Sequence, residues 1–86
     1  MPIDYTQLRG LTARRLVTAL QRDGFTLARR KGATRFFTHP DGRRVTIHLH
    51  SPGQVLPIGT LQEIIENEAR WTADDLRRLR LISRAH

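Results

Sequence analysis

Cysteine is absent from this sequence, and acidic and aromatic residues are both scarce. Without cysteine the chain forms neither disulfides nor thiolate metal sites, which is typical of proteins from a reducing cytosol. No apolar run approaches the roughly 20 residues that cross a bilayer, and no signal-peptide pattern opens the sequence. We therefore expect a soluble, cytoplasmic protein without a membrane partner.

Large side chains for a core are also few, because three Phe, one Trp and one Tyr are the aromatic residues among 86. A chain of this size buries a modest core and depends on good packing. It contains no repeats, low-complexity segments or interdomain linkers. We expect a single domain over residues 1–86, with an ordered core at about 11–82 and a loosely held start over 1–10.

The shortage of acidic residues is local. The chain has a formal net charge of +7, and residues 1–60 contain ten basic and three acidic residues, whereas residues 61–86 contain five of each. A basic excess on one part of a chain predicts a polyanionic partner, most often nucleic acid. A solvated basic face, or a patch for an acidic protein, is the alternative.

Residues 29–50 predict two strands around a tight turn. In the Pro-Asp-Gly sequence at residues 40–42, proline presets φ for the first loop position and glycine takes the left-handed third position. Such a three-residue loop pairs His39 with Arg43 and so fixes the register of both strands.

This register assigns side chains to two faces, because they alternate along a strand. Phe37 and Val45 begin an apolar face that Ile47 and Leu49 continue. The other face combines positive charge, an aromatic ring and imidazole, and consists of Thr34, Phe36, Thr38, Arg44, Thr46 and His48. The first face requires a core, and we expect the function on the second.

A preceding strand is expected over residues 25–30, followed by a short turn at residues 31–33. Its alternation predicts that Phe25 and Leu27 face the core. The residues predicted to face outward are Thr26, Ala28 and Arg30.

A first helix is predicted from the N-cap Thr12 to about Asp23, with Gly24 as the left-handed stop. Its first turn carries Arg14 and Arg15, where the helix dipole disfavours cations. We expect these two arginines to contact phosphates. Pairing with acidic residues of a later helix is an equally good explanation.

Two capping boxes predict further helices. Residues 60–63 (Thr-Leu-Gln-Glu) and residues 72–75 (Thr-Ala-Asp-Asp) both have the pattern, and Trp71 can pack across the second cap against Leu76. The order α-β-β-β-α, followed by a short helix, predicts an α+β fold. A three-stranded antiparallel sheet with the helices on one face is the simplest way to bury the apolar stripes.

The usual enzyme motifs are absent: there is no phosphate-binding glycine loop, no Ser-His-Asp spacing and no HExxH. His48 and His50 have a spacing that can begin a metal site, but the sequence offers no obvious third ligand. We therefore predict no metal and no cofactor, and surface histidines that can transfer protons or contact phosphates.

Several spaced signatures follow one another through about residues 12–79. They are Asp23-Gly24-Phe25, residues 30–40, Val45-Thr46, His50 and Gly59-Thr60-Leu61 with Ile64-Ile65. Together they resemble the HicA (YcfA-like) toxins, small mRNA interferases of type II toxin–antitoxin pairs. The resemblance implies a fold similar to double-stranded-RNA-binding domains, RNA as the ligand, and an acidic HicB-like antitoxin as partner.

The chain departs from this family at one position. Members usually read Lys/Arg-Gly-Ser-His at the start of the second strand, and that histidine is the catalytic residue; here the position holds Thr34. Threonine cannot act as a general acid or base near neutral pH. In the predicted register His48 lies directly across from Thr34, with Cβ atoms about 4.5–5.5 Å apart. We therefore expect His48, with His50, to carry any cleavage activity.

The resulting hypothesis is an RNA-binding endoribonuclease that cleaves mRNA without metal, through attack of a ribose 2′-OH on the adjacent phosphorus. Phe36 would stack on a base, and the residues expected to contact phosphates are Arg30, Lys31, Arg35 and Arg44, besides Arg14 and Arg15. Two alternatives stay open. One is a non-catalytic RNA-binding domain, and the other is a basic module that only docks an acidic antitoxin.

Overall fold

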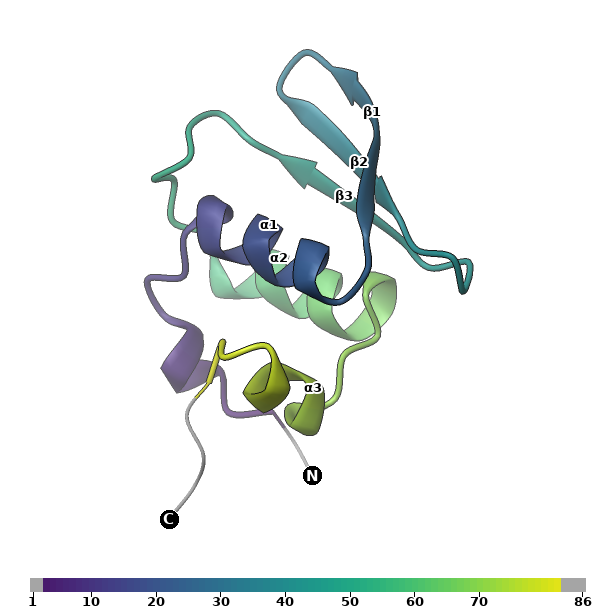
Figure 1. Ribbon diagram of the computed structural model, residues 1–86. Helices are drawn as coiled ribbons and strands as arrows, with labels where there is room; N and C mark the ends of the chain where they lie inside the picture. Colours follow the sequence, from purple (N-terminus) through teal and green to yellow (C-terminus); the bar gives the residue numbers. More distant parts are fainter. Residues whose placement is uncertain (1–2, 83–86) are drawn as a thin grey trace.

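The computed structural model describes residues 3–82 and has the predicted α+β fold, in which helices pack on one face of an open, three-stranded antiparallel sheet (Figure 1). The sheet order is β1-β2-β3. The main elements are α1 (Ala13–Arg22), β1 (Thr26–Lys31), β2 (Thr34–Thr38), β3 (Arg44–His48), α2 (Ile58–Gln62) and α3 (Ala73–Arg78). Among residues 3–82, no helix combines the length and apolar character that crossing a membrane requires.

Helix α1 begins and ends as its sequence predicts. The Thr12 side chain accepts a hydrogen bond from the Arg15 N–H at 3.3 Å, and Asp23 is the C-cap. Gly24 follows with φ of +102°, a left-handed conformation that suits glycine. Leu16 and Leu20 lie fully buried against the core.

The β2–β3 hairpin confirms the register predicted from its loop. The His39 N–H donates to the Arg43 carbonyl at 3.0 Å, and Gly42, with φ of +97°, closes the turn. Further along, Phe37 pairs with Val45. We call the face that carries these two side chains the inner face, because the helices cover it, and the opposite face the outer face.

Strand β1 differs from the prediction because it contains a bulge. Leu27 pairs with Phe37 but Arg29 pairs with Phe36, so Ala28 is an extra residue on β1. Leu27 is 44% exposed, so its predicted place in the core is wrong. It belongs to an edge strand, all six residues of which are exposed.

The bulge also exchanges the faces of the basic residues that follow it, since a one-residue shift moves each side chain to the other face. Arg30 pairs with Arg35 and therefore lies on the inner face, contrary to the prediction. Arg29 and Lys31 lie on the outer face instead, through their pairing with Phe36 and Thr34 respectively.

The start of the chain is more ordered than its sequence suggests. Residues Tyr5–Leu8 form a 3₁₀ helix, and Leu8 is completely buried. The Tyr5 hydroxyl donates a hydrogen bond to the Glu66 carboxylate. The prediction of a loosely held segment over residues 1–10 is therefore wrong for residues 3–10. Leu8 anchors this segment in the core, although the sequence around it has no periodic apolar pattern. Residues 1–2 lie outside the described residues.

The second helix begins earlier than its apparent capping box. Helix α2 starts at Ile58 with Pro57 as N-cap and no side-chain cap, so Thr60 lies inside the helix. Proline presets φ at this boundary and has no N–H to satisfy. The helix continues as a π-helical segment, η2 (Glu63–Glu68). The capping box at residues 72–75, in contrast, is present as predicted.

Candidate functional site

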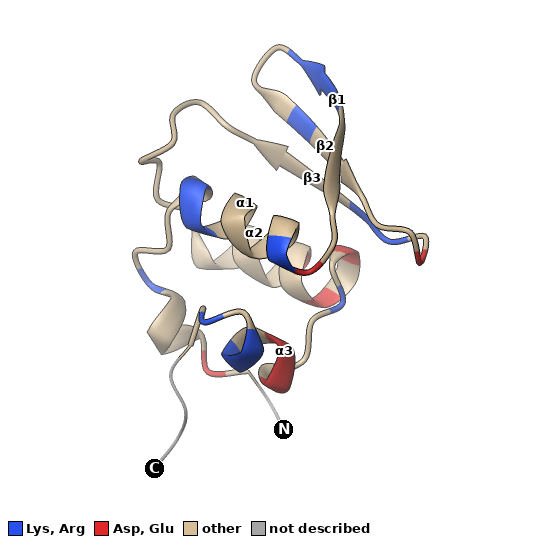
Figure 2. Cartoon of the chain, viewed as in Figure 1, with Lys and Arg blue, Asp and Glu red and all other residues tan. Residues whose placement is uncertain are grey.

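The outer face of the sheet is open in the described part of the chain, because the helices pack on the other face (Figure 1). Basic residues lie on the three strands, and acidic residues lie in loops and helices instead (Figure 2). The outer face consists of Arg29 and Lys31 from β1, Thr34, Phe36 and Thr38 from β2, and Arg44, Thr46 and His48 from β3. Positive charge, a ring and an imidazole thus share one surface.

Thr34 and His48 meet on this face as predicted. They are paired across β2 and β3, and Thr34 Oγ1 lies 3.1 Å from His48 Nδ1. When Nδ1 carries the ring proton it donates to the threonine oxygen, and Nε2 then has a free lone pair. The threonine can therefore hold the exposed imidazole with its basic nitrogen toward solvent.

Phe36 occupies the middle of the outer face and is half-buried. The Arg29 guanidinium carbon lies 5.9 Å from the centroid of its ring, a cation–π distance. Sequence reasoning missed Arg29 because the bulge at Ala28 cannot be read from alternation. A nucleobase can stack on an aromatic ring or on a guanidinium plane, and this pair offers both.

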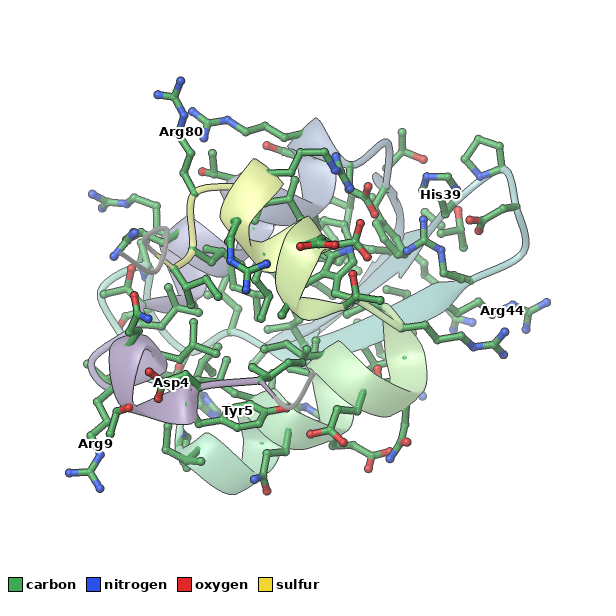
Figure 3. The ribbon with its side chains drawn as sticks, turned by 90° about the horizontal axis from the view of Figure 1, so that it is seen from below. Asp4, Tyr5, Arg9, His39, Arg44 and Arg80 are labelled. Carbon is green, nitrogen blue, oxygen red and sulfur yellow. The ribbon has the colours of Figure 1, made fainter. Side chains whose placement is uncertain are left out.

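The four cations expected in one phosphate track are divided by the sheet. Lys31 and Arg44 lie on the outer face, and Arg44 points away from the protein (Figure 3). Arg30 and Arg35 lie opposite each other on the inner face, and Arg35 Nη1 donates to the Gly32 carbonyl at 2.8 Å. The cations on the outer face are therefore Arg29, Lys31 and Arg44.

Arg14 and Arg15 lie away from this face. Arg15 Nη2 donates to the Arg80 carbonyl at 3.4 Å, and Arg80 and Arg44 lie on opposite sides of the molecule (Figure 3). Together with Arg22, these helix residues line a cleft of about 300 Å³. Within residues 3–82 neither Arg14 nor Arg15 pairs with a carboxylate, so the alternative of ion pairs to a later helix is wrong.

His39 has a structural role that the sequence did not reveal. Its Nδ1 accepts the Asp41 N–H at 3.1 Å, so Nε2 carries the proton and donates to the Asp23 carbonyl at 2.7 Å. The ring contacts Phe25 edge-on at 5.0 Å. A Cβ at Gly24 would lie only 2.9 Å from Nε2. His39 therefore holds the β2–β3 loop against the end of α1 (Figure 3).

His50 is exposed just beyond β3, and its backbone N–H donates to the Gln54 side chain at 2.8 Å. Its imidazole forms no hydrogen bond or ion pair within the described residues. No group of three or more metal-ligating side chains gathers there either, counted over residues 3–82. The geometry thus connects Thr34 with His48 but leaves His50 separate.

Comparison with known families gives one match. Residues 13–68, well over half of the chain, match the model of a family described as the HicA toxin of bacterial toxin-antitoxin. The matched range extends from α1 through η2 and contains the complete sheet with its outer face. A comparison with curated proteins finds no match.

Proposed function

Because the chain belongs to the HicA toxin family of bacterial toxin–antitoxin systems, we propose that it binds RNA on the outer face of its sheet. The observation that supports this most directly is the composition of that face, where Arg29, Lys31 and Arg44 surround Phe36 without an acidic residue on any strand. Cations contact phosphates irrespective of sequence, and a partly exposed aromatic ring can stack on a base.

The same face offers a base for RNA cleavage. His48 Nε2 takes the proton of a ribose 2′-OH, and the 2′ oxygen forms a bond to the adjacent phosphorus. The bond from phosphorus to the 5′ oxygen breaks, and that oxygen takes a proton from solvent. The products are a 2′,3′-cyclic phosphate and a 5′-hydroxyl. Lys31, which pairs with Thr34 beside His48, stabilises the negative charge that grows on the phosphate oxygens.

A non-catalytic RNA-binding domain is the second candidate. Thr34 stands where the resemblance places the catalytic histidine, and a threonine can position an imidazole but cannot replace it. Binding and cleavage therefore need separate measurements. An antitoxin protein is the partner implied by the family, and an acidic, HicB-like protein fits the basic sheet best.

The first prediction concerns phosphate contacts. RNA affinity should fall with salt by a slope of about −0.7 per contact for single strands, or about −2 for three contacts. Lys31→Gln with Arg44→Gln should weaken binding to all sequences alike and remove about 1.4 from that slope. Fluorescence anisotropy with a labelled single-stranded RNA over a series of salt concentrations measures both quantities.

The matched control is the double variant Arg30→Gln with Arg35→Gln, which removes the same amount of charge from the inner face of the same sheet. It should change the slope much less. Equal losses in the two double variants, or affinity that does not respond to salt, would contradict binding at the outer face.

The second prediction concerns cleavage. With chelator present, His48→Ala should lower the cleavage rate of labelled RNA by about 10²–10⁴-fold, since it removes the general base. RNA affinity should remain near that of the unmodified protein. Equal rates for the two proteins would exclude this role of His48. An inactive chain that becomes active through Thr34→His would show instead an RNA-binding fold without its catalyst.

A further inference from the structure

The sheet has two edge strands, and the described chain closes only one of them. On β3, the Thr46 N–H donates to the Glu68 carboxylate at 2.8 Å, and the His48 carbonyl accepts from the Gln54 side chain at 3.4 Å. On β1, the backbone bonds to β2 alone within residues 3–82, and all six residues are exposed.

The hydrogen bonds of β3 show which groups of β1 face this open edge. Thr46 directs its N–H away from β2, so its pairing with Phe36 is of the kind without hydrogen bonds. Pairs with and without hydrogen bonds alternate along two antiparallel strands. The backbone N–H and carbonyl of Phe36 therefore bond to β1, and those of Arg35 bond to β3. Arg30, which lies opposite Arg35, therefore directs its N–H and carbonyl toward the open edge.

The side chains along this edge are basic on both faces. Arg29 and Lys31 lie on the outer face and Arg30 on the inner face, because of the bulge. Leu27, at the other end of the strand, is one of two exposed large hydrophobic residues among residues 3–82. A strand that pairs here requires consecutive acidic residues beside 29–31 and an apolar residue beside Leu27.

We propose that the open edge of β1 binds an extended acidic segment of the antitoxin, which pairs as an additional antiparallel strand. Main-chain hydrogen bonds to Arg30 would give affinity, and the basic side chains would select acidic residues. The same charges repel a second copy of this chain. The inference rests on the proposed function, because its partner is the antitoxin of a toxin–antitoxin pair.

The consequence is a mode of inhibition. An added strand lies about 4.8 Å from β1, where its carboxylates can pair with Arg29 and Lys31, two of the three cations on the outer face. Paired with carboxylates, these side chains can no longer contact phosphates. Binding of the acidic strand should therefore displace RNA.

The probe for this edge is a blocked seven-residue peptide in which three successive glutamates precede a valine, with threonine elsewhere. In antiparallel pairing, the glutamates lie beside residues 29–31 and the valine beside Leu27. With the full chain labelled for NMR, we expect the peptide to slow hydrogen exchange of the Arg30 amide. A peptide methylated on alternate backbone nitrogens keeps every charge and should bind about tenfold more weakly or worse.

A pair of variants separates main-chain bonding from charge. Arg30→Pro removes the outward N–H, and an edge strand tolerates proline at a position that forms no ladder bond. Arg30→Gln removes the same charge but keeps the N–H. The proline variant should bind the peptide about tenfold more weakly than the glutamine variant, the effect of about one hydrogen bond. The comparison of the two peptides on the unmodified chain gives the same information if the proline variant does not fold.

Three results would overturn the inference: no binding at millimolar peptide, equal binding of the methylated peptide, or binding without protection of the Arg30 amide. The last two would mean docking by charge alone. Displacement of labelled RNA by the peptide would support the inference. Failure of RNA to bind the free chain, with the Arg30 amide still protected by the peptide, would contradict the proposed function and leave the strand site standing.

Discussion

Replacing Phe37 by alanine is expected to lower the free energy of unfolding by about 3–5 kcal/mol. Phe37 is 3% exposed and lies on the inner face, opposite Val45, where α1 and α2 cover the sheet. Truncation leaves a cavity that a core this small cannot fill by relaxing. Since small domains are stable by about 5–15 kcal/mol, this single change removes a large part of the total.

The neighbouring ring provides the matched control. Phe36 is half-buried on the outer face, and Phe36→Ala should cost about 1 kcal/mol or less in stability. It should instead weaken RNA binding by about 1–3 kcal/mol through the lost stacking surface. Urea unfolding and RNA titration of both variants distinguish the two effects. The reverse pattern would mean that the proposed RNA surface is on the wrong face.

Replacing Asp23 by alanine is expected to destabilise the protein by about 3 kcal/mol. The Asp23 side chain is only 8% exposed and joins three elements. It accepts hydrogen bonds from Trp71 Nε1 at 2.8 Å and Arg78 Nη2 at 2.7 Å, and it pairs with Arg43 Nη2 at 3.1 Å. In the alanine variant, the buried indole N–H of Trp71 and the largely buried guanidinium of Arg43 lose this partner. Leaving buried polar groups unpaired costs more free energy than removing both partners.

An exposed carboxylate on α3 serves as control. Asp74, in the first turn of that helix, is 93% exposed and pairs with Arg77 in its last turn. Because solvent screens this pair, Asp74→Ala should cost less than about 1 kcal/mol. Comparable losses for Asp23→Ala and Asp74→Ala in thermal or urea unfolding would show that the buried network contributes little.

The Asp23 network should also make stability depend on pH. Burial by itself raises the pKa of Asp23, but hydrogen bonds from Trp71 and Arg78, with the charges of Arg43 and Arg78, outweigh it and hold the pKa below its ordinary value of 3.8. The contribution is then fully present above the unfolded pKa and is lost as pH falls through the lower folded value. The stability difference between the unmodified chain and Asp23→Ala should therefore shrink on acidification below about pH 4.

This network matters for the proposed RNA surface as well as for stability. Arg43, held by Asp23 and by the Ala69 carbonyl, directly precedes Arg44 on β3. Asp23 also fixes the loop through the bond from His39 to its carbonyl. Asp23, Gly24, Phe25 and His39 thus belong to one structural network that joins the end of α1 to the β2–β3 loop.

The sequence by itself determined the features that local chemistry controls. The Pro-Asp-Gly loop set the register of β2 and β3, and with it the faces of Phe36 and Phe37 and the meeting of Thr34 with His48. A turn of fixed length allows only one pairing of the two strands that it joins. Alternation along each strand then assigns every side chain to one face of the sheet. The ends of α1 and the capping box of α3 were equally readable, because a cap depends on a few adjacent residues.

Tertiary structure alone decided where the basic residues lie. The bulge at Ala28 exchanged the faces of Arg29 and Arg30, and an edge strand without an apolar pattern gives no sign of such an extra residue. The distance of Arg14 and Arg15 from the outer face, and the closing of β3 by Glu68, depend on how helices pack on the sheet. Charge on a sequence shows that a polyanion is a suitable partner, whereas the surface that meets it is set by contacts between residues far apart in the chain.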